Sequence, residues 1–256
     1  MSRKRKAHRS ERIEFLERQL DSNTLAIKEG PTKKKWTTLD LKPVQALNSS
    51  QEDMFHHFHN ETHLCAHGSA GTGKTFLAAY LALRELLDPR TPQKKIIIVR
   101  SAVATRDLGF LPGTLDEKVS EFETPYKDIF AELLGRNSSY DDMKAAGLVK
   151  FLSTSYIRGL TWDDALIIVD EGQNLAFHEI NSVMTRLGQN SRIIFTGDFP
   201  QTDLRKHRGD VSGMEDFVKV VDRLKDFARV EFSHHDIVRS KFVKSWIIAS
   251  EEVVGL

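Results

Sequence analysis

Cysteine is almost absent from this 256-residue chain, because Cys65 is the only one. A single cysteine cannot form an intramolecular disulfide or build a cysteine-based zinc site. No apolar run approaches the length of a membrane span, and the charged opening MSRKRKAHRSER lacks the apolar region of a secretory signal peptide. We therefore expect a protein of the reducing cytoplasm with no membrane partner.

Net charge is also scarce, since 37 Lys and Arg residues nearly balance 36 Asp and Glu residues to leave +1. The distribution is nevertheless uneven. Residues 1–35 contain eleven basic and five acidic side chains, so the rest of the chain carries about five negative charges. The Gly30-Pro31 pair is typical of a turn or linker. Together with the uneven charge, it predicts a basic arm or linker over residues 1–40 and one domain over residues 41–256. The arm is either a solvated tail or a nucleic-acid contact.

Helical and strand patterns alternate from residue 44 onward. Apolar runs such as KIIIVR (Lys95–Arg100) and ALIIV (Ala165–Val169) are typical of buried parallel strands. Four more strands are predicted at Thr62–His67, Leu148–Leu152, Arg192–Phe195 and Arg229–Phe232. Helices are predicted at Gln51–His59, Phe76–Leu87, Lys118–Leu134, Glu179–Leu187, Gly213–Leu224 and Lys241–Glu251. The alternation predicts a three-layer α/β fold, with a mostly parallel sheet flanked by helices.

The motif GSAGTGKT matches the G-x-x-x-x-G-K-T phosphate-binding loop and lies between a predicted strand and a predicted helix. Its glycines allow backbone N–H groups to converge on phosphate oxygens at a helix N-terminus. Lys74 would add a positive charge at the β- and γ-phosphates, and the Thr75 hydroxyl would ligate Mg²⁺. The predicted nucleotide-binding set is Gly68, Ser69, Ala70, Gly71, Thr72, Gly73, Lys74 and Thr75.

Two acids follow the buried run ALIIV at the carboxyl end of its strand, where α/β sheets bind ligands. We expect Asp170 to hold Mg²⁺ and Glu171 to orient or deprotonate the attacking water. A neighbouring strand runs into Thr196-Gly197-Asp198 and then Gln201. Its carboxyl end should lie next to the phosphate-binding loop, where Gln201 could sense the γ-phosphate.

Five segments together strongly resemble the PhoH family of single-domain ATPases, which are related to the core of superfamily-one helicases. They are GSAGTGKT, RSAVATRDLGFLPGTLDEKV, SYIRGLTWDDALIIVDEGQN, TRLGQNSRIIFTGDFPQTDL and HHDIVRS, and the similarity covers about residues 45–243. The resemblance implies a RecA-like sheet, ATP and Mg²⁺ as ligands, and links to phosphate starvation and RNA metabolism. A compact chain of this type also resembles the version found in bacteriophages, which would work in the host cytoplasm.

The resemblance also suggests roles for residues outside the loop. Gln51 matches a glutamine that reads adenine, Gln201 the γ-phosphate sensor, and Arg239 an arginine that reaches the γ-phosphate. Arg239 would act within one chain, or it would be supplied by a neighbouring subunit of a homo-oligomer such as a hexamer. Gly172 stands where relatives often carry Ala or Ser, a difference that we expect to be harmless.

The leading functional hypothesis is therefore Mg²⁺-dependent ATP hydrolysis, with Lys74, Asp170, Glu171, Gln201 and Arg239 as catalytic residues. We expect it to be coupled to single-stranded RNA or DNA. A nucleotide-dependent binding module or switch with little turnover is the alternative. Ribonuclease activity is a third reading with less support, because no second carboxylate or histidine cluster is arranged for it.

Overall fold

The structure is a computed structural model that describes residues 36–101, 115–198 and 212–254, with side chains described from residue 121 in the second range. The chain divides into two units, Met1–Lys35 and Trp36–Leu256. All described residues belong to the second unit. The boundary near residue 40 stays a prediction from the sequence.

A six-stranded parallel sheet forms the centre of the described unit. Its strands are β1 (His63–Gly68), β2 (Lys95–Arg100), β3 (Val149–Ser153), β4 (Ala165–Val169), β5 (Arg192–Gly197) and β6 (Phe227–Phe232). They lie in the order β3-β2-β4-β5-β1-β6, and every neighbouring pair is parallel. Strand β1, which runs directly into the phosphate-binding loop, is thus separated from β4 by β5.

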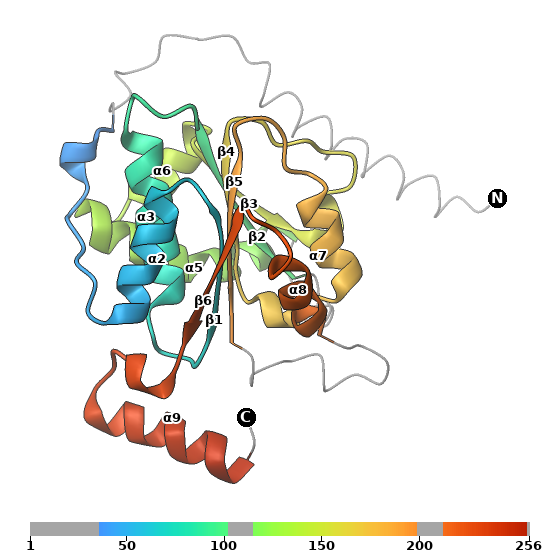
Figure 1. The fold of residues 1–256 in the computed structure, drawn as a ribbon. Coiled ribbons are helices and arrows are strands. Elements are labelled where there is room, and N and C mark those ends of the chain that lie inside the picture. Colours follow the sequence, from blue (N-terminus) through green and yellow to red (C-terminus); the bar gives the residue numbers. More distant parts are fainter. Residues whose placement is uncertain (1–35, 102–114, 199–211, 255–256) are drawn as a thin grey trace. The chain divides into compact units, whose positions relative to one another are not determined.

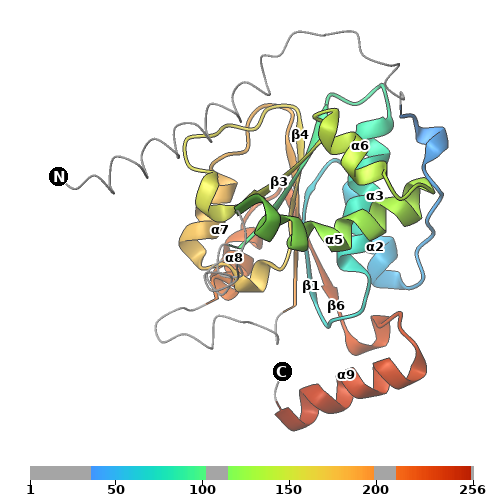
Figure 2. The same ribbon diagram turned by 180° about the vertical axis from the view of Figure 1, so that it is seen from behind.

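Helices cover both faces of the sheet (Figures 1 and 2). On one face lie α2 (Ser49–His59), α3 (Lys74–Leu87), α5 (Leu115–Leu134) and α6 (Ser139–Ala145). On the other face lie α7 (Phe177–Met184) and α8 (Met214–Val221). The predicted three-layer, RecA-like α/β fold is confirmed. Within the described ranges, no helix combines the length and apolar character needed to cross a lipid bilayer.

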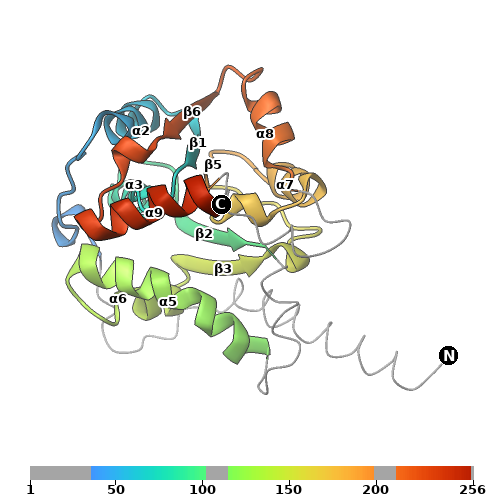
Figure 3. The ribbon, with the colours of Figure 1, turned by 90° about the horizontal axis from the view of Figure 1, so that it is seen from below.

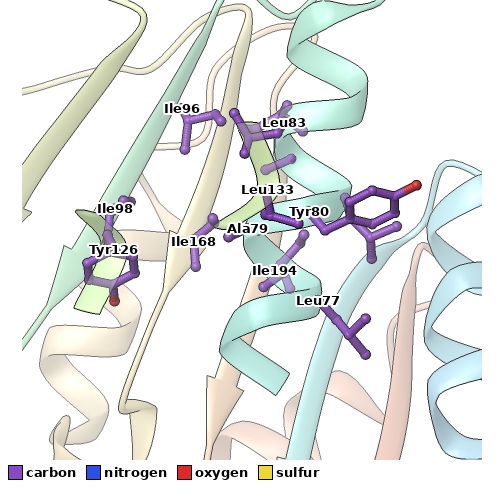
Figure 4. Packing of buried hydrophobic residues seen from close by; sticks show 14 of the residues in the cluster. Leu77, Ala79, Tyr80, Leu83, Ile96, Ile98, Tyr126, Leu133, Ile168 and Ile194 are labelled. Atoms are coloured by element: carbon purple, nitrogen blue, oxygen red, sulfur yellow. The ribbon is translucent and has the colours of Figure 1, made fainter. Parts of the chain in front are cut away.

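The strand side chains alternate between two apolar layers, as the two-residue period of a strand requires. In β2, Ile96 and Ile98 pack beneath α3 and α5, whereas Ile97 and Val99 pack toward α7 and α8. Figure 4 shows the first layer, where Leu77, Leu83 and Leu133 meet isoleucines from neighbouring strands. Burial on both faces explains why these strands read as continuous apolar runs.

The predicted strands are all present, with ends within two residues of the predicted ones, and β2 and β4 match the prediction. The predicted helices are present too, with ends that differ by up to three residues. Helix α6 is the one described α-helix that was not predicted, because its seven residues are too few to show a clear apolar period. Its Tyr140 and Met143 are nevertheless fully buried.

Helix α9 (Lys241–Val254) lies beyond one end of the sheet rather than on either face (Figures 1 and 3). This is the carboxyl end of the strands. A Cβ atom placed on Gly71 would lie 3.3 Å from Ile247 Cδ1, so α9 borders the phosphate-binding loop. The main-chain N–H of Val238, just before α9, donates to Gly71 O at 3.0 Å.

The single thiol offers a direct test of the fold. Cys65 is fully buried in β1, and burial raises the pKa of its thiol to about 12. Because the thiolate is the reactive form, we expect an aromatic disulfide reagent to label native protein very slowly at pH 8. The same reagent should label one thiol per chain in denaturant. Rapid labelling of the native protein would contradict the placement of β1 inside the sheet, between β5 and β6.

Candidate functional site

The phosphate-binding loop has the backbone that its glycines were predicted to allow. Gly68, Gly71 and Gly73 have φ values of 123°, 72° and 87°, in the region that favours glycine. At Gly68 the constraint is also steric, since a Cβ atom would lie 2.0 Å from the carbonyl oxygen of Phe232. Helix α3 starts directly after Gly73, so its N-terminus faces the loop.

Lys74 is buried and its ammonium group lies inside the loop. Its Nζ donates to Ser69 O at 2.6 Å and to Thr72 Oγ1 at 3.2 Å. It also forms an ion pair with Asp198 Oδ1 at 2.7 Å. Asp198 follows β5, so the strand between β1 and β4 supplies the counter-ion of the loop lysine.

Asp170 accepts hydrogen bonds from three hydroxyl groups. Thr75 Oγ1 and Thr196 Oγ1 both donate to Asp170 Oδ1 at 2.8 Å, and the Tyr126 hydroxyl donates to Oδ2 at 2.5 Å. Burial, together with the Asp170 charge, raises the pKa of Tyr126 well above its ordinary value, so the phenol remains a neutral donor. Asp170 itself is 5% exposed. These bonds compensate the burial of its charge.

Glu171 lies beside Asp170 with a left-handed backbone, φ 53° and ψ 44°, which is unusual for a residue with a side chain. Gln173 Nε2 donates to its Oε2 at 2.5 Å, and Arg100 Nη2 lies 3.5 Å from its Oε1. Burial and the neighbouring Asp170 charge raise the pKa of Glu171, while Arg100 and the Gln173 hydrogen bond oppose that shift. A carboxylate with a raised pKa is suited to accept a proton near neutral pH.

Gln51 and Arg239 reach the same region from distant parts of the chain. Gln51 is buried; its Nε2 donates to Thr72 O at 3.0 Å and its Oε1 accepts from Leu47 N at 2.8 Å. Its amide thus supports the loop, and an amide keeps a second donor and a second lone pair. The Arg239 side chain is exposed, with Cγ 3.1 Å from the position that a Cβ atom of Gly71 would take.

A cavity of about 520 Å³ connects these groups. Its lining includes Gln51, the loop from Gly71 to Thr75, both acids at the end of β4, the end of β5 and Arg239. The volume lies in the range of small-molecule and cofactor sites. The cavity therefore brings together the predicted residues Gln51, Gly71–Thr75, Asp170, Glu171 and Arg239. Gly68, Ser69 and Ala70 belong to the loop but not to this lining, and Gln201 lies outside the described residues.

Several functional side chains were not predicted from the sequence. Tyr126, Thr196 and Arg100 contact the acids, and Gln173 and Asp198 join the network around them. The Arg100 guanidinium lies 3.8 Å from Asp170 Oδ2 and 3.5 Å from Glu171 Oε1. Thr196, Gln173 and Asp198 could have been found from their places in the TGD and DEGQ segments, and Arg100 from its place at the end of β2. Tyr126, within α5, carries no such signal.

The donor set fits a magnesium nucleotide. Mg²⁺ prefers hard oxygen ligands and is usually bound by one or two protein oxygens together with substrate phosphates and water. The Thr75 hydroxyl and the Asp170 carboxylate supply such oxygens 2.8 Å apart. Loop N–H groups at the start of α3 and the Lys74 ammonium supply the matching charge for phosphate.

The fold and the site together define a P-loop NTPase. Residues 43–251 match the family described as PhoH-like protein, and the chain belongs to this family. The predicted family resemblance is confirmed.

Relatives from diverse bacteria support this assignment. The PhoH-like protein of Bacillus subtilis (strain 168) is 37% identical over 186 residues, covering 72% of this chain and 57% of the relative. Protein PhoH of Escherichia coli (strain K12) is 33% identical over 203 residues, covering 78% of this chain and 56% of the relative. The chain thus spans little more than half the length of these relatives.

Among solved structures, a Pif1 helicase from Candida albicans shares 15% identity with this chain at a TM-score of 0.38. The alignment covers 78% of this chain and 43% of the helicase. A second structure, of Pif1 helicases at forked double-stranded DNA, shares 14% identity at a TM-score of 0.34 and covers 74% and 44% of the two chains.

Gly172 is more constrained than the sequence indicated. The difference from the alanine or serine of relatives was expected to be harmless, and glycine fits here, but a Cβ atom would lie 2.0 Å from Phe195 Cε1. Phe195 is fully buried in β5, and its ring packs against Phe217 at 4.3 Å between centroids. The small residue in the DEGQ segment is therefore required by the aromatic ring in the neighbouring strand.

We expect Gly172→Ala to lower the free energy of unfolding by about 1–3 kcal/mol, as overpacking of a core does. Combining it with Phe195→Leu, which removes the clashing ring atoms, should recover part of that loss. Urea unfolding of the two single variants and the double variant measures the coupling. A double variant whose loss equals the sum of the single losses would contradict the steric explanation.

Proposed function

We propose that the chain binds ATP with Mg²⁺ in the 520 Å³ cavity and hydrolyses it to ADP and phosphate. The observation that carries this proposal is that residues Gly71–Thr75 of the phosphate-binding loop, both acids and Arg239 line one cavity. Nucleotide binding alone would require only the phosphate-binding loop. Paired acids next to it, one buried and hydrogen-bonded and one with a raised pKa, match what hydrolysis requires.

Each residue of the site has a defined task in this proposal. Loop N–H groups and Lys74 bind the β- and γ-phosphates, while Thr75 and Asp170 would hold Mg²⁺, which neutralises phosphate charge when bound. Glu171 orients a water and accepts its proton as the water oxygen attacks the γ-phosphorus. The bond from that phosphorus to the bridging oxygen then breaks, and ADP departs.

Arg239 would stabilise charge on the transferred phosphoryl group, since its planar guanidinium suits phosphate oxygens. It lines the same cavity as Lys74 of its own chain, which supports action within one chain. Gln51, which lines the same cavity, would contact the adenine edge, and Gln201 would sense the γ-phosphate.

We further propose that turnover is coupled to single-stranded RNA or DNA in the cytoplasm. Support comes from the resemblance to superfamily-one helicase cores and from the basic composition of residues 1–35. Phosphate release should therefore increase when single-stranded RNA or DNA is added. Equal rates with and without both polymers would contradict the coupling while leaving hydrolysis intact.

Substituting Glu171 tests hydrolysis itself. We expect Glu171→Gln to lower kcat for phosphate release about 10²- to 10⁴-fold, because a general base contributes that much, while ATP affinity is retained. Lys74→Ala should abolish ATP binding. Glu215→Gln, which changes an exposed acid in the first turn of α8, is the matched control and should behave like the unsubstituted protein.

The outcomes also separate the alternatives. An unsubstituted protein that binds ATP tightly but releases no phosphate would favour a nucleotide-dependent switch. RNA cleavage that persists in Lys74→Ala would favour a ribonuclease.

Arg239 allows a test of whether the site is complete in one chain. We expect Arg239→Ala to lower kcat about 10³-fold, the lower end of arginine contributions to phosphoryl transfer. The kcat per chain of the unsubstituted protein should stay constant from dilute to concentrated solution. If kcat per chain rises with protein concentration, a neighbouring subunit completes the site.

A further inference from the structure

Gln173 lies at the centre of a chain of contacts that the proposed chemistry does not yet use. Its side chain is 3% exposed and lies two residues after Glu171, in the short 3-10 turn η4 (Gly172–Asn174). Nε2 donates to Glu171 Oε2 at 2.5 Å, and Oε1 accepts from the main-chain N–H of Asp198 at 2.9 Å. One amide thus joins the end of β4 to the end of β5. We call these two hydrogen bonds the Gln173 bridge.

The far end of the bridge is connected to the phosphate-binding loop. Asp198, whose N–H donates to Gln173, also forms the ion pair with Lys74 at 2.7 Å. Lys74 in turn donates to the carbonyl oxygen of Ser69 within the loop. A continuous path of polar contacts therefore runs from the phosphate-binding lysine through Asp198 and Gln173 to the carboxylate that would position water.

The other end of the bridge is Glu171, whose backbone conformation must be stabilised by its surroundings. Glu171 has a left-handed backbone, a conformation that costs about 1–3 kcal/mol for a residue with a side chain and persists only where surroundings enforce it. The Glu171 side chain is 41% exposed. Besides Gln173, it contacts Arg100, whose Nη2 lies 3.5 Å from Glu171 Oε1. The short hydrogen bond from Gln173 is the closer of these two restraints.

The backbone around the bridge is shaped to admit it. A Cβ atom on Gly197 would lie 3.1 Å from Gln173 Oε1 and 3.2 Å from Gln173 N. These distances are tighter than ordinary contacts, so a side chain there would push against the amide. Glycine between Thr196 and Asp198 therefore leaves the space that the amide occupies.

We infer that Gln173 is a positioning residue for the Glu171 carboxylate. The position of that carboxylate would depend on whether Lys74 pairs with Asp198 or with phosphate. This inference rests on the proposed ATP hydrolysis. Phosphate oxygens at Lys74 compete with Asp198 for its ammonium group, and a shift of Asp198 is transmitted through its N–H to Gln173 and so to Glu171. The bridge thereby couples occupancy of the phosphate site to placement of the base.

The test uses three substitutions in the full chain. Gln173→Met keeps the side-chain length and removes both hydrogen bonds, while Gln173→Glu keeps the acceptor for Asp198 N–H but loses the donor to Glu171. Gly197→Ala leaves the glutamine in place and crowds its amide. Gln93→Met is the matched control, because Gln93 is equally buried, at 4%, and its Nε2 donates to Asn190 O rather than into the site.

We expect both Gln173 variants and Gly197→Ala to lower kcat for ATP about 10- to 100-fold, as loss of a residue that orients a reacting group does. The Kd for ATP should change less than about 2-fold, a split that marks an effect on positioning rather than binding. Gln93→Met should lower Tm by a similar amount to Gln173→Met but leave kcat unchanged.

Three results would overturn the inference: a kcat for Gln173→Met no lower than that of Gln93→Met, a Gln173→Glu variant with unchanged kcat, or losses that appear only in the Kd for ATP. Glu171→Gln, measured in parallel, separates this failure from that of the proposed function. If Glu171→Gln is inactive and Gln173→Met is fully active, only the positioning role is wrong. If the unsubstituted protein releases no phosphate, the proposed hydrolysis itself is wrong. If it does, but Glu171→Gln is equally active, the role of Glu171 as the base is wrong.

Discussion

The Asp170 carboxylate accepts hydrogen bonds from hydroxyl groups of three different elements: Thr75 at the start of α3, Thr196 in β5 and Tyr126 in α5. A buried carboxylate without such partners would be strongly destabilising. Hydrogen bonds to a charged group contribute about 1.5–3 kcal/mol each, more than neutral ones. The buried charge of Asp170 is therefore tolerated only when three elements are in place. They are α3, strand β5 of the sheet, and α5.

Strand order makes this meeting point possible. Because β5 lies between β1 and β4, its carboxyl end lies between the start of the phosphate-binding loop and the two acids. Thr196 and Asp198 fill that space, one facing the acid side and one pairing with Lys74. The loop and the acids are thus not merely adjacent but connected by side chains of a third strand. This arrangement is what the proposed combination of phosphate binding and water positioning requires.

The sequence predicted the parts of the site that local patterns encode. The loop from Gly68 to Thr75 and the acids after β4 each follow from a short motif next to a strand, and the sheet follows from its apolar runs. Tyr126 could not be predicted, because it is 44 residues from its partner Asp170 and only the packing of α5 brings them together. The clash at Gly172 was missed for the same reason, since Phe195 comes from another strand.

Binding of Mn²⁺ in place of Mg²⁺ tests the central role of Asp170 most directly, because electron paramagnetic resonance counts the free and bound ion without relying on turnover. We expect one Mn²⁺ bound per chain in the presence of a non-hydrolysable ATP analogue. The affinity for Mn²⁺ should be at least about 10-fold weaker in Asp170→Asn, because its amide lacks the charge that attracts the cation. Equal Mn²⁺ affinity in the two proteins would contradict the account.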